Sequence, residues 1–253
     1  MFGILSRPVD SGRKAGRPLR RFSFVPLLVL SLAALAGCRG ASGAARTPTP
    51  EPTATPEPLD LSVFRGFTYP IKGGCLPKGD QLMPNAPRQY RGGVHEGIDL
   101  YSYDNCTPIG KGTAVLAAKG GTVIRADHTY HALTPAELTA ANTRIAEGHA
   151  NDFDVLDLFR GQQVWIDHGR GIVTRYAHLS DIAANILIGT KVAQGDLIAF
   201  VGDSGTPESI SAPGVEEHLH FELRAGDDFL GKGLPPAEVR TIYERLFQPL
   251  AAP

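Results

Sequence analysis

Two histidines one residue apart, in the segment HLHFEL, are the first sign of chemistry in this chain. His218 and His220 would point the same way in a strand, because side chains alternate between its two faces. Leu219 and Phe221 would then point the opposite way, toward a core. An apolar back with two imidazoles in front is a reasonable start for a metal or proton-transfer site. A half-exposed polar face that contains two histidines is the other reading of this fragment.

A second segment, GGVHEGIDLY, contains His95 and Asp99. At a spacing of four residues they share one face in a helix and also in an extended chain. Gly97 between them favours a turn or the start of a strand over a helix. A histidine, a carboxylate and a distant histidine form a common ligand set for catalytic zinc, which leaves the fourth tetrahedral position open. The segment YAHL adds His178, inside a strand-like run.

The elements that must position these residues are short strands separated by glycine turns. Residues 113–126, 163–179 and 190–205 each contain two strand-like runs, and residues 218–226 form a final strand. We interpret the three turns as hairpins, at Lys119–Gly121, His168–Gly171 and Gln194–Asp196. At least six short strands with this punctuation predict a mainly β fold, built as a compact antiparallel sheet or sandwich.

Residues 127–160 interrupt this pattern with helical sequence. Thr134 fits the N-cap of a helix and Pro135 its first position, with good helix formers after them. The run NDFDVLDLF predicts a second short helix. We interpret the region as a helical insertion within one domain that spans residues 59–253, and PPAEVRTIYERLF predicts a helix near residue 240.

The three histidine motifs occur in an order that resembles a known family. H-x-G-x-D, then Y-x-H-L, then H-x-H followed by an aromatic residue and Glu resembles the lysostaphin-type, or LytM-like, zinc metallopeptidases. Enzymes of that family cleave peptide bonds in bacterial peptidoglycan. The glycine-rich runs GTAVLAAKGGTVI and GTKVAQGDLIAFVGDSG also look like the family's. The resemblance covers about residues 66–226 without the insertion, and it implies the duplicated hybrid motif, a fold similar to a barrel-sandwich hybrid.

The resemblance also implies a role for each residue of the motifs. His95, Asp99 and His220 match the ligands of Zn²⁺, and His178 and His218 match the two histidines that deprotonate the attacking water and stabilise the transition state. The function implied is a zinc-dependent endopeptidase acting on stem or cross-link peptides of peptidoglycan. Some relatives lose ligands and activate cell-wall amidases instead, so a catalytically silent regulator is the alternative. Because all five positions are present here, we favour activity.

Several features leave their roles open. The run GTKVAQGDLIAFVGDSG also resembles a lipoyl or biotinyl hairpin, but its turn carries no lysine to modify. The insertion could set substrate choice, cover the groove or dock a partner. Glu96 faces away from His95 in an extended chain, which argues against a role as general base. Glu222 shares the face of His218 and His220 and is a candidate to hold a ligand ring.

The N-terminal residues predict an export signal and a lipid anchor. Residues 1–37 join a basic segment to the uncharged run FSFVPLLVLSLAALA, which is short of the roughly 20 residues that span a membrane. The run ends in LAGC, which resembles the bacterial lipobox, so we expect residues 1–37 to be a lipoprotein signal peptide and Cys38 to be lipidated. An uncleaved anchor helix is the alternative. Residues 38–58 are rich in Pro and Thr and predict a disordered linker.

This leader predicts a body that lies outside the cytoplasmic membrane, attached to it by lipid. In an oxidising compartment Cys75 and Cys106 are expected to form a disulfide that contributes about 3 kcal/mol, with a thiolate metal pair as the alternative. Residues 38–253 contain 19 basic and 25 acidic side chains, a net charge of −6. That charge gives no support to nucleic-acid binding. We expect a monomer.

Overall fold

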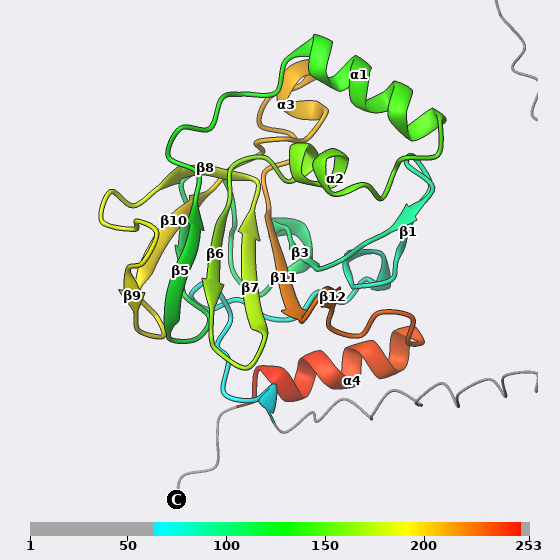
Figure 1. Cartoon of the computed structure of the whole chain (residues 1–253). Helices are drawn as coiled ribbons and strands as arrows, with labels where there is room; N and C mark the ends of the chain where they lie inside the picture. Colours follow the sequence, from blue (N-terminus) through cyan, green and yellow to red (C-terminus); the bar gives the residue numbers. More distant parts are fainter. Residues whose placement is uncertain (1–62, 249–253) are drawn as a thin grey trace, which may run out of the picture. The chain divides into compact units, whose positions relative to one another are not determined.

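The computed structural model describes residues 63–248, and its largest element is an antiparallel sheet of seven strands (Figure 1). The predicted signal peptide, the lipidation site Cys38 and the Pro/Thr-rich linker lie outside the described residues. In spatial order the strands are β12 (Asp228–Phe229), β11 (Leu219–Ala225), β7 (Ile172–Ala177), β6 (Val164–Asp167), β5 (Gly121–Ala126) and β9 (Lys191–Val192). Strand β3 (Ile98–Leu100) also pairs with β11.

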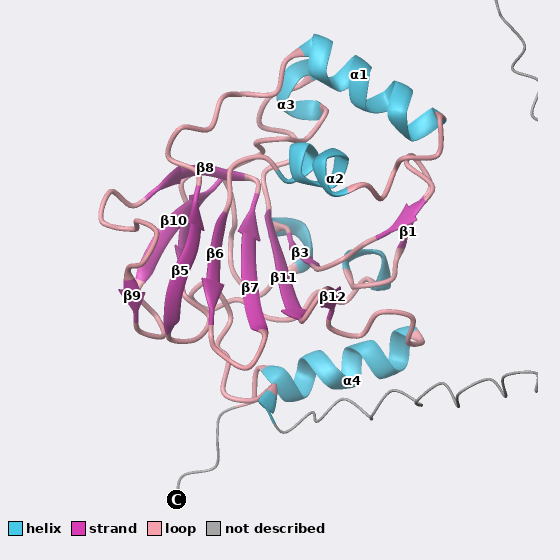
Figure 2. Cartoon of the chain, in the orientation of Figure 1, coloured by secondary structure: helices cyan, strands magenta, loops and turns pink. Residues whose placement is uncertain are grey.

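Two smaller sheets complete the β structure (Figure 2). One has the order β4 (Ala114–Leu116), β10 (Leu197–Val201) and β8 (Leu179–Ile182), and the other pairs β1 (Pro87–Arg88) with β2 (Gly93–Val94). Every pairing is antiparallel. Val115 and Ile198 of the three-stranded sheet belong to the same buried cluster as Ile166 and Phe221 of the large sheet. A core shared by two sheets confirms the predicted antiparallel, mainly β fold.

Only one of the three glycine turns forms the predicted hairpin. The turn at His168–Gly171 joins the paired strands β6 and β7. The turn at Lys119–Gly121 instead leads from β4, which pairs with β10, to β5, which pairs with β6 and β9. The turn at Gln194–Asp196 likewise connects β9 and β10, which lie in different sheets. These two hairpin predictions are wrong because the chain just before the first turn pairs with the second turn: the N–H of Ala117 donates to the carbonyl of Asp196, and the N–H of Gly195 donates to the carbonyl of Ala117, both at 2.9 Å.

The helices of the insertion lie at one end of the large sheet, beside the short helix α3 (Glu208–Ser211), and α4 (Pro236–Leu246) lies at the other end (Figure 1). Helix α1 (Pro135–Ala146) begins with the predicted cap: Thr134 accepts from the N–H of Glu137, whose carboxylate accepts from the N–H of Thr134. Helix α2 (Phe153–Arg160) follows. Two short 3₁₀ helices, η2 (Asp80–Leu82) and η3 (Ser102–Asp104), also lie in the described part of the chain.

Cys75 and Cys106 form a disulfide in the segment between the linker and β4. The side chain of Asn105 links the same two segments, since it accepts from the N–H of Cys75 at 3.1 Å and donates to the carbonyl of Cys75 at 2.9 Å. Within residues 63–248 no helix combines the length and apolar character needed to cross a membrane.

Candidate active site

The pairing of β3 with β11 places an aspartate directly opposite a histidine. In this register Asp99 faces His220, while Leu219 and Phe221 are fully buried behind them, as the alternation of a strand requires. Gly97 allows the close approach, because a Cβ at that position would lie 2.4 Å from the carbonyl oxygen of Phe221. The two side chains meet at 2.8 Å, between Asp99 Oδ1 and His220 Nδ1.

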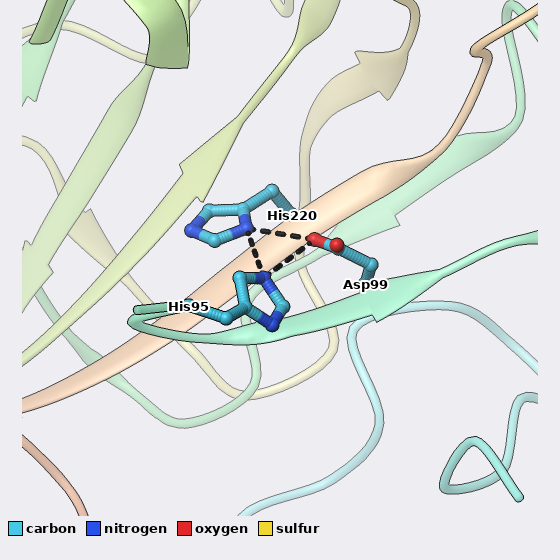
Figure 3. Close-up of side chains that lie close together, drawn as sticks. All are labelled: His95, Asp99 and His220. Atoms are coloured by element: carbon cyan, nitrogen blue, oxygen red, sulfur yellow. Dashed lines mark hydrogen bonds and ion pairs between the residues drawn. The ribbon is translucent and has the colours of Figure 1, made fainter. Parts of the chain in front are cut away.

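His95 completes a triangle of donor atoms from the segment between β2 and β3 (Figure 3). Its backbone is fixed by two bonds to the segment 85–86, since its N–H donates to Ala86 at 2.8 Å and its carbonyl accepts from Asn85 at 2.9 Å. His95 Nε2 lies 2.9 Å from Asp99 Oδ1 and 3.0 Å from His220 Nδ1. All three residues are buried, and they are a group that could hold a metal ion.

Hydrogen bonds on the far side of each ring decide which nitrogens carry protons. His95 Nδ1 lies 3.0 Å from the carbonyl oxygen of Met83, and His220 Nε2 lies 3.1 Å from Glu222 Oε1. Burial would raise the pKa of Glu222, but the charges of its arginine neighbours, Arg160 first, hold it well below the usual range, so this oxygen only accepts. Both outer nitrogens therefore donate, and in neutral rings both inner nitrogens point lone pairs at Asp99.

Three electron-rich atoms that converge in this way require a positive charge between them. Burial lowers the pKa of His95 to about 4. Burial would raise the pKa of Asp99, yet the neighbouring histidines hold it well below its usual value, so its carboxylate is ionised. A proton is one way to supply the charge: burial lowers the pKa of His220, but hydrogen bonds to Asp99 and Glu222 outweigh it and raise the pKa. A divalent cation is the other.

The donor set fits zinc in both number and type. Two imidazole nitrogens and one carboxylate oxygen are a set of three ligands typical of catalytic zinc, which keeps its fourth position open. Ligands about 2.1 Å from a tetrahedral zinc stand roughly 3.4 Å apart. The separations of 2.8 to 3.0 Å between the three atoms need only a small expansion to reach that value. The site residues His95, Asp99 and His220 therefore fit the metal that the sequence resemblance implies.

His178 and His218 lie beside this triangle, and both present a free ring nitrogen. The ring of His218 is 4.5 Å from that of His178, and its Nε2 lies 3.7 Å from Asp99 Oδ1. Nδ1 of His218 donates to the carbonyl of Glu216 at 2.7 Å, and Nδ1 of His178 donates to that of Ser204 at 2.8 Å. Burial lowers the pKa of His218 and holds the pKa of His178 well below its usual value. In the neutral rings both Nε2 atoms are therefore proton acceptors.

The backbone at His178 differs from the predicted strand. His178 was expected inside a strand-like run, but it separates β7 from β8 and has a φ of 59°, in the left-handed region. Few residues other than glycine adopt this conformation, and here it turns the chain from the large sheet into the three-stranded sheet. The N–H of His178 donates to the carbonyl of Arg160 at 2.9 Å. The sequence gives no sign of this break, because a left-handed histidine has no pattern of its own.

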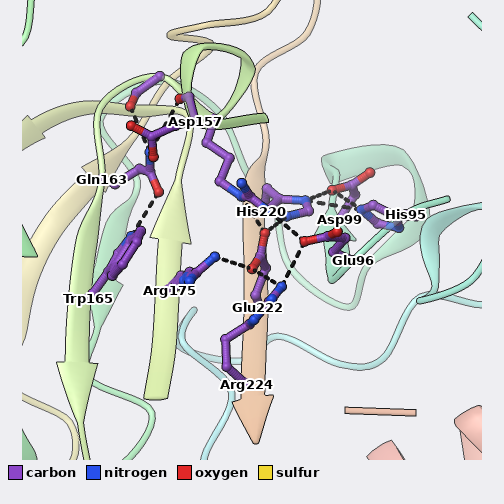
Figure 4. A network of polar contacts seen from close by, with 12 residues as sticks. His95, Glu96, Asp99, Asp157, Gln163, Trp165, Arg175, His220, Glu222 and Arg224 are labelled. Atoms are coloured by element: carbon purple, nitrogen blue, oxygen red, sulfur yellow. Dashed lines mark hydrogen bonds and ion pairs between the residues drawn. The ribbon is translucent and has the colours of Figure 1, made fainter. Parts of the chain in front are cut away.

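Behind His220, a buried cluster of three arginines and two glutamates holds the ring (Figure 4). Glu222 is fully buried and accepts from Arg160 Nε at 2.5 Å, and from Arg175 and Arg224 at 3.3 Å each. Glu96 accepts from Arg160 at 2.6 Å and from Arg224 at 2.7 Å. Glu96 thus serves as an ion-pair partner, and Glu222 makes the contact with a ligand ring for which it was a candidate.

Sequence reasoning missed two groups of the site. Arg88 donates to Asp99 Oδ2 at 2.8 Å and so fixes the carboxylate whose other oxygen faces the histidines. The ring of Tyr101 stacks on that of His218 at 4.1 Å, and its hydroxyl donates to Glu216 at 2.5 Å. Tyr101 directly follows strand β3 (Ile98–Leu100), which could be expected from the sequence. The contact of its ring with the ring of His218 could not, because it depends on the fold.

The five site residues line a groove of about 800 Å³. The insertion forms part of its wall through Leu138 and Asn142 of α1 and Phe159 of α2, and the loop after β10 contributes Thr206. The insertion therefore borders the site, as expected if it influences which substrate enters. The exposed rings of Tyr90 and Tyr103 also line the groove.

Comparison with known proteins agrees with this arrangement. The family model of Peptidase family M23 matches residues 93–230, more than half of the chain, and confirms the resemblance to lysostaphin-type peptidases. No curated protein sequence matches significantly.

Solved structures resemble the chain over part of its length. One is a zinc-containing peptidase from Vibrio cholerae, with 22% identity and a TM-score of 0.42, over 68% of this chain and 41% of that one. Another is the catalytic domain of the antimicrobial peptidase lysostaphin from Staphylococcus simulans, with 19% identity and a TM-score of 0.34, over 66% and 84%. On the evidence of the family match, this chain is a member of peptidase family M23.

Proposed function

We propose that the protein is a zinc-dependent endopeptidase that hydrolyses peptide bonds in bacterial peptidoglycan. One observation carries the proposal: the inner atoms of His95, Asp99 and His220 converge within 3.0 Å of one another, while the outer nitrogens of both rings are already bonded. Such a centre suits a divalent cation. Two further histidines with free nitrogens stand beside it on the wall of a groove of about 800 Å³, a volume typical of ligand-binding clefts.

The residues of the chain divide the work of hydrolysis between them. His95, Asp99 and His220 would hold the ion, and a zinc ion there supplies a Lewis acid that acidifies water and polarises the scissile carbonyl. His218 or His178 accepts the proton of the attacking water at Nε2. The same imidazolium then donates that proton to the nitrogen of the leaving amine as the carbon–nitrogen bond breaks. Neutral rings are needed to begin, and the lowered pKa of both histidines supports this state.

The place of action follows from the leader rather than from the site. We propose that lipidated Cys38 attaches the protein to the outer face of the bacterial cytoplasmic membrane, and that residues 39–58 extend the domain toward the wall. Twelve residues in polyproline II conformation would reach roughly 35 Å. Stem or cross-link peptides would be the substrate, and the protein would act as a monomer.

The test is digestion of several peptidoglycan types by the full-length protein, with the products identified by mass spectrometry and the metal by elemental analysis. The proposal expects one zinc per chain, peptide-bond products from at least one type, and loss of cleavage with a chelator. A zinc-loaded protein that cleaves none of them would refute the enzymatic proposal. It would leave the regulator of cell-wall amidases, which is tested by amidase activity measured with and without the protein.

A further inference from the structure

Three arginines line the groove, and only two of them have an acidic partner. Arg88 is paired with Asp99, and Arg160 with Glu96 and Glu222. The third, Arg91, lies in the loop between β1 and β2 and has no ion pair with any acid among residues 63–248. It is nevertheless only 7% exposed. A guanidinium so well shielded from water is rarely left without an opposite charge.

The hydrogen bonds of Arg91 go to neutral groups. Nη1 donates to the side-chain oxygen of Asn151 at 3.0 Å, and Nη2 donates to the carbonyl of Val94. A guanidinium has five N–H donors, so most of its donor capacity is not used by these two bonds. The guanidinium is held by these two hydrogen bonds, and its Nη1 lies against Gly93, where a Cβ would come within 2.3 Å of it. Arg91 is therefore a fixed and unneutralised cation on the groove wall.

We propose that Arg91 binds a carboxylate of the peptide in the groove, an inference that rests on the proposed peptidase function. A guanidinium matches a carboxylate with two parallel hydrogen bonds, which few other side chains can do. Because the side chain is already fixed, little conformational entropy is lost on binding. A group with one negative charge suits the site, since Glu208 and Glu216 also line the groove. Arg91 would thus select peptides that carry a free carboxylate.

Asn151 makes this proposal testable without removing the arginine. It is exposed and lies in the insertion between α1 and α2, so changes there should leave the fold intact. Asn151→Asp places a carboxylate on Arg91 and neutralises it while strengthening the contact. Asn151→Ala removes the contact and leaves the charge. If Arg91 binds the carboxylate of a peptide, Asn151→Ala keeps the preference for a free carboxylate and Asn151→Asp loses it. If Arg91 has a purely structural role, Asn151→Asp behaves like the wild type and Asn151→Ala is the variant that is impaired.

The experiment measures peptide affinity by calorimetry, in full-length, zinc-loaded protein that also carries His218→Ala to prevent turnover. The probes are a stem peptide of peptidoglycan and the same peptide with its carboxylates amidated one at a time, which separates a terminal carboxylate from a side-chain one. We expect one amidation to weaken binding about 10- to 100-fold, the range for hydrogen bonds to a charged group. Asn151→Ala should keep this preference. Asn151→Asp and Arg91→Gln should lose it and bind both peptides like the amidated one.

Three results would overturn the inference: no amidation that weakens binding, a preference that survives in Asn151→Asp, or a preference lost in Asn151→Ala but kept in Asn151→Asp. If Arg91→Gln does not fold, the two Asn151 variants decide the question. Failure of the proposed function gives a different result: a protein with all five site histidine and aspartate residues that cleaves no peptidoglycan but still prefers the peptide with its free carboxylate. Cleavage without any such preference would refute the role of Arg91 alone.

Discussion

Replacing Glu222 by Gln should weaken zinc binding through the ring of His220. The carboxylate accepts from His220 Nε2 at 3.1 Å and so keeps a lone pair on the nitrogen that faces the metal position. Loss of such a contact to a ligand typically lowers metal affinity 10- to 100-fold, which corresponds to about 1.4 to 2.7 kcal/mol. Because glutamine has nearly the same shape as glutamate, the expected loss of zinc affinity comes from the missing negative charge and from the weaker preference for the His220 tautomer protonated at Nε2.

The same substitution should also lower the stability of the protein. Arg160, Arg175 and Arg224 carry three positive charges against the two of Glu96 and Glu222, so the variant raises the net charge of this buried group from +1 to +2. Breaking a buried ion pair on one side costs about 3 to 5 kcal/mol. Urea unfolding of chelator-treated protein should show a loss of that size.

Glu96→Gln is the matched control. Glu96 accepts from Arg160 at 2.6 Å and from Arg224 at 2.7 Å, and its replacement by Gln removes one negative charge from the same buried group. Unlike Glu222, however, Glu96 makes no hydrogen bond to His220. We expect a smaller loss of stability, since the side chain is 17% exposed, and nearly unchanged zinc affinity. Zinc affinity is measured by competition with a chromophoric chelator at a temperature where both variants are folded. Equal losses of affinity in the two variants, or none in Glu222→Gln, would refute the reasoning.

Other substitutions test the rest of the site and the fold. His178→Ala and His218→Ala should each abolish peptide cleavage and retain one zinc per chain by elemental analysis; loss of zinc would make either residue a ligand. Burial lowers the pKa of His168 in the folded protein. As the pH falls through about 6.5, this histidine therefore binds a proton in the unfolded chain but stays neutral in the folded protein. Stability should therefore fall as pH decreases below about 6.5, and less steeply in His168→Asn when urea titrations at pH 7 and pH 5 are compared. Replacing Cys75 and Cys106 by Ser should lower the free energy of unfolding by about 3 to 4 kcal/mol for a loop closed over 31 residues; a loss under about 1 kcal/mol would contradict this.

The local parts of the site could be predicted because their rules act over a few residues. The period of two in a strand places His218 and His220 on one face with Leu219 and Phe221 behind. The cap of α1 follows from Thr134 and its neighbours for the same reason. Such patterns depend on bonds between residues close in sequence, so they survive without knowledge of the fold.

The turns show where this local reasoning ends. A glycine turn between two apolar runs is compatible with a hairpin and with a corner between two sheets. At Gly120 the choice depends on distant chain, since a Cβ there would lie 3.3 Å from the carbonyl of Val192. The partner strand β9 comes about 70 residues after β5, and β10 comes more than 80 residues after β4. Periodicity inside the segment cannot reveal such a partner.

The charged groups behind His220 were beyond prediction for a related reason. Arg160 is the last residue of α2, where a basic side chain is expected simply because it interacts well with the helix dipole. Its partners Glu222 and Glu96 are 62 and 64 residues away. Nothing in the helix itself distinguishes an arginine that faces water from one that neutralises a buried glutamate.

Arg160 connects the helical region of residues 127–160 to the candidate site. The insertion ends at this residue, whose carbonyl accepts from the backbone of His178 and whose guanidinium holds Glu222. The next residue, Gly161, has a φ of 65° and a Cβ there would lie 2.2 Å from the carbonyl of Ser204, the same oxygen that accepts from His178 Nδ1. The end of the insertion is therefore fixed on one side by His178 and on the other by Glu222, which holds the ring of His220. Helix α1 makes no such contact to His95, Asp99 or His220, so we expect changes in its length and sequence to leave these three residues in place.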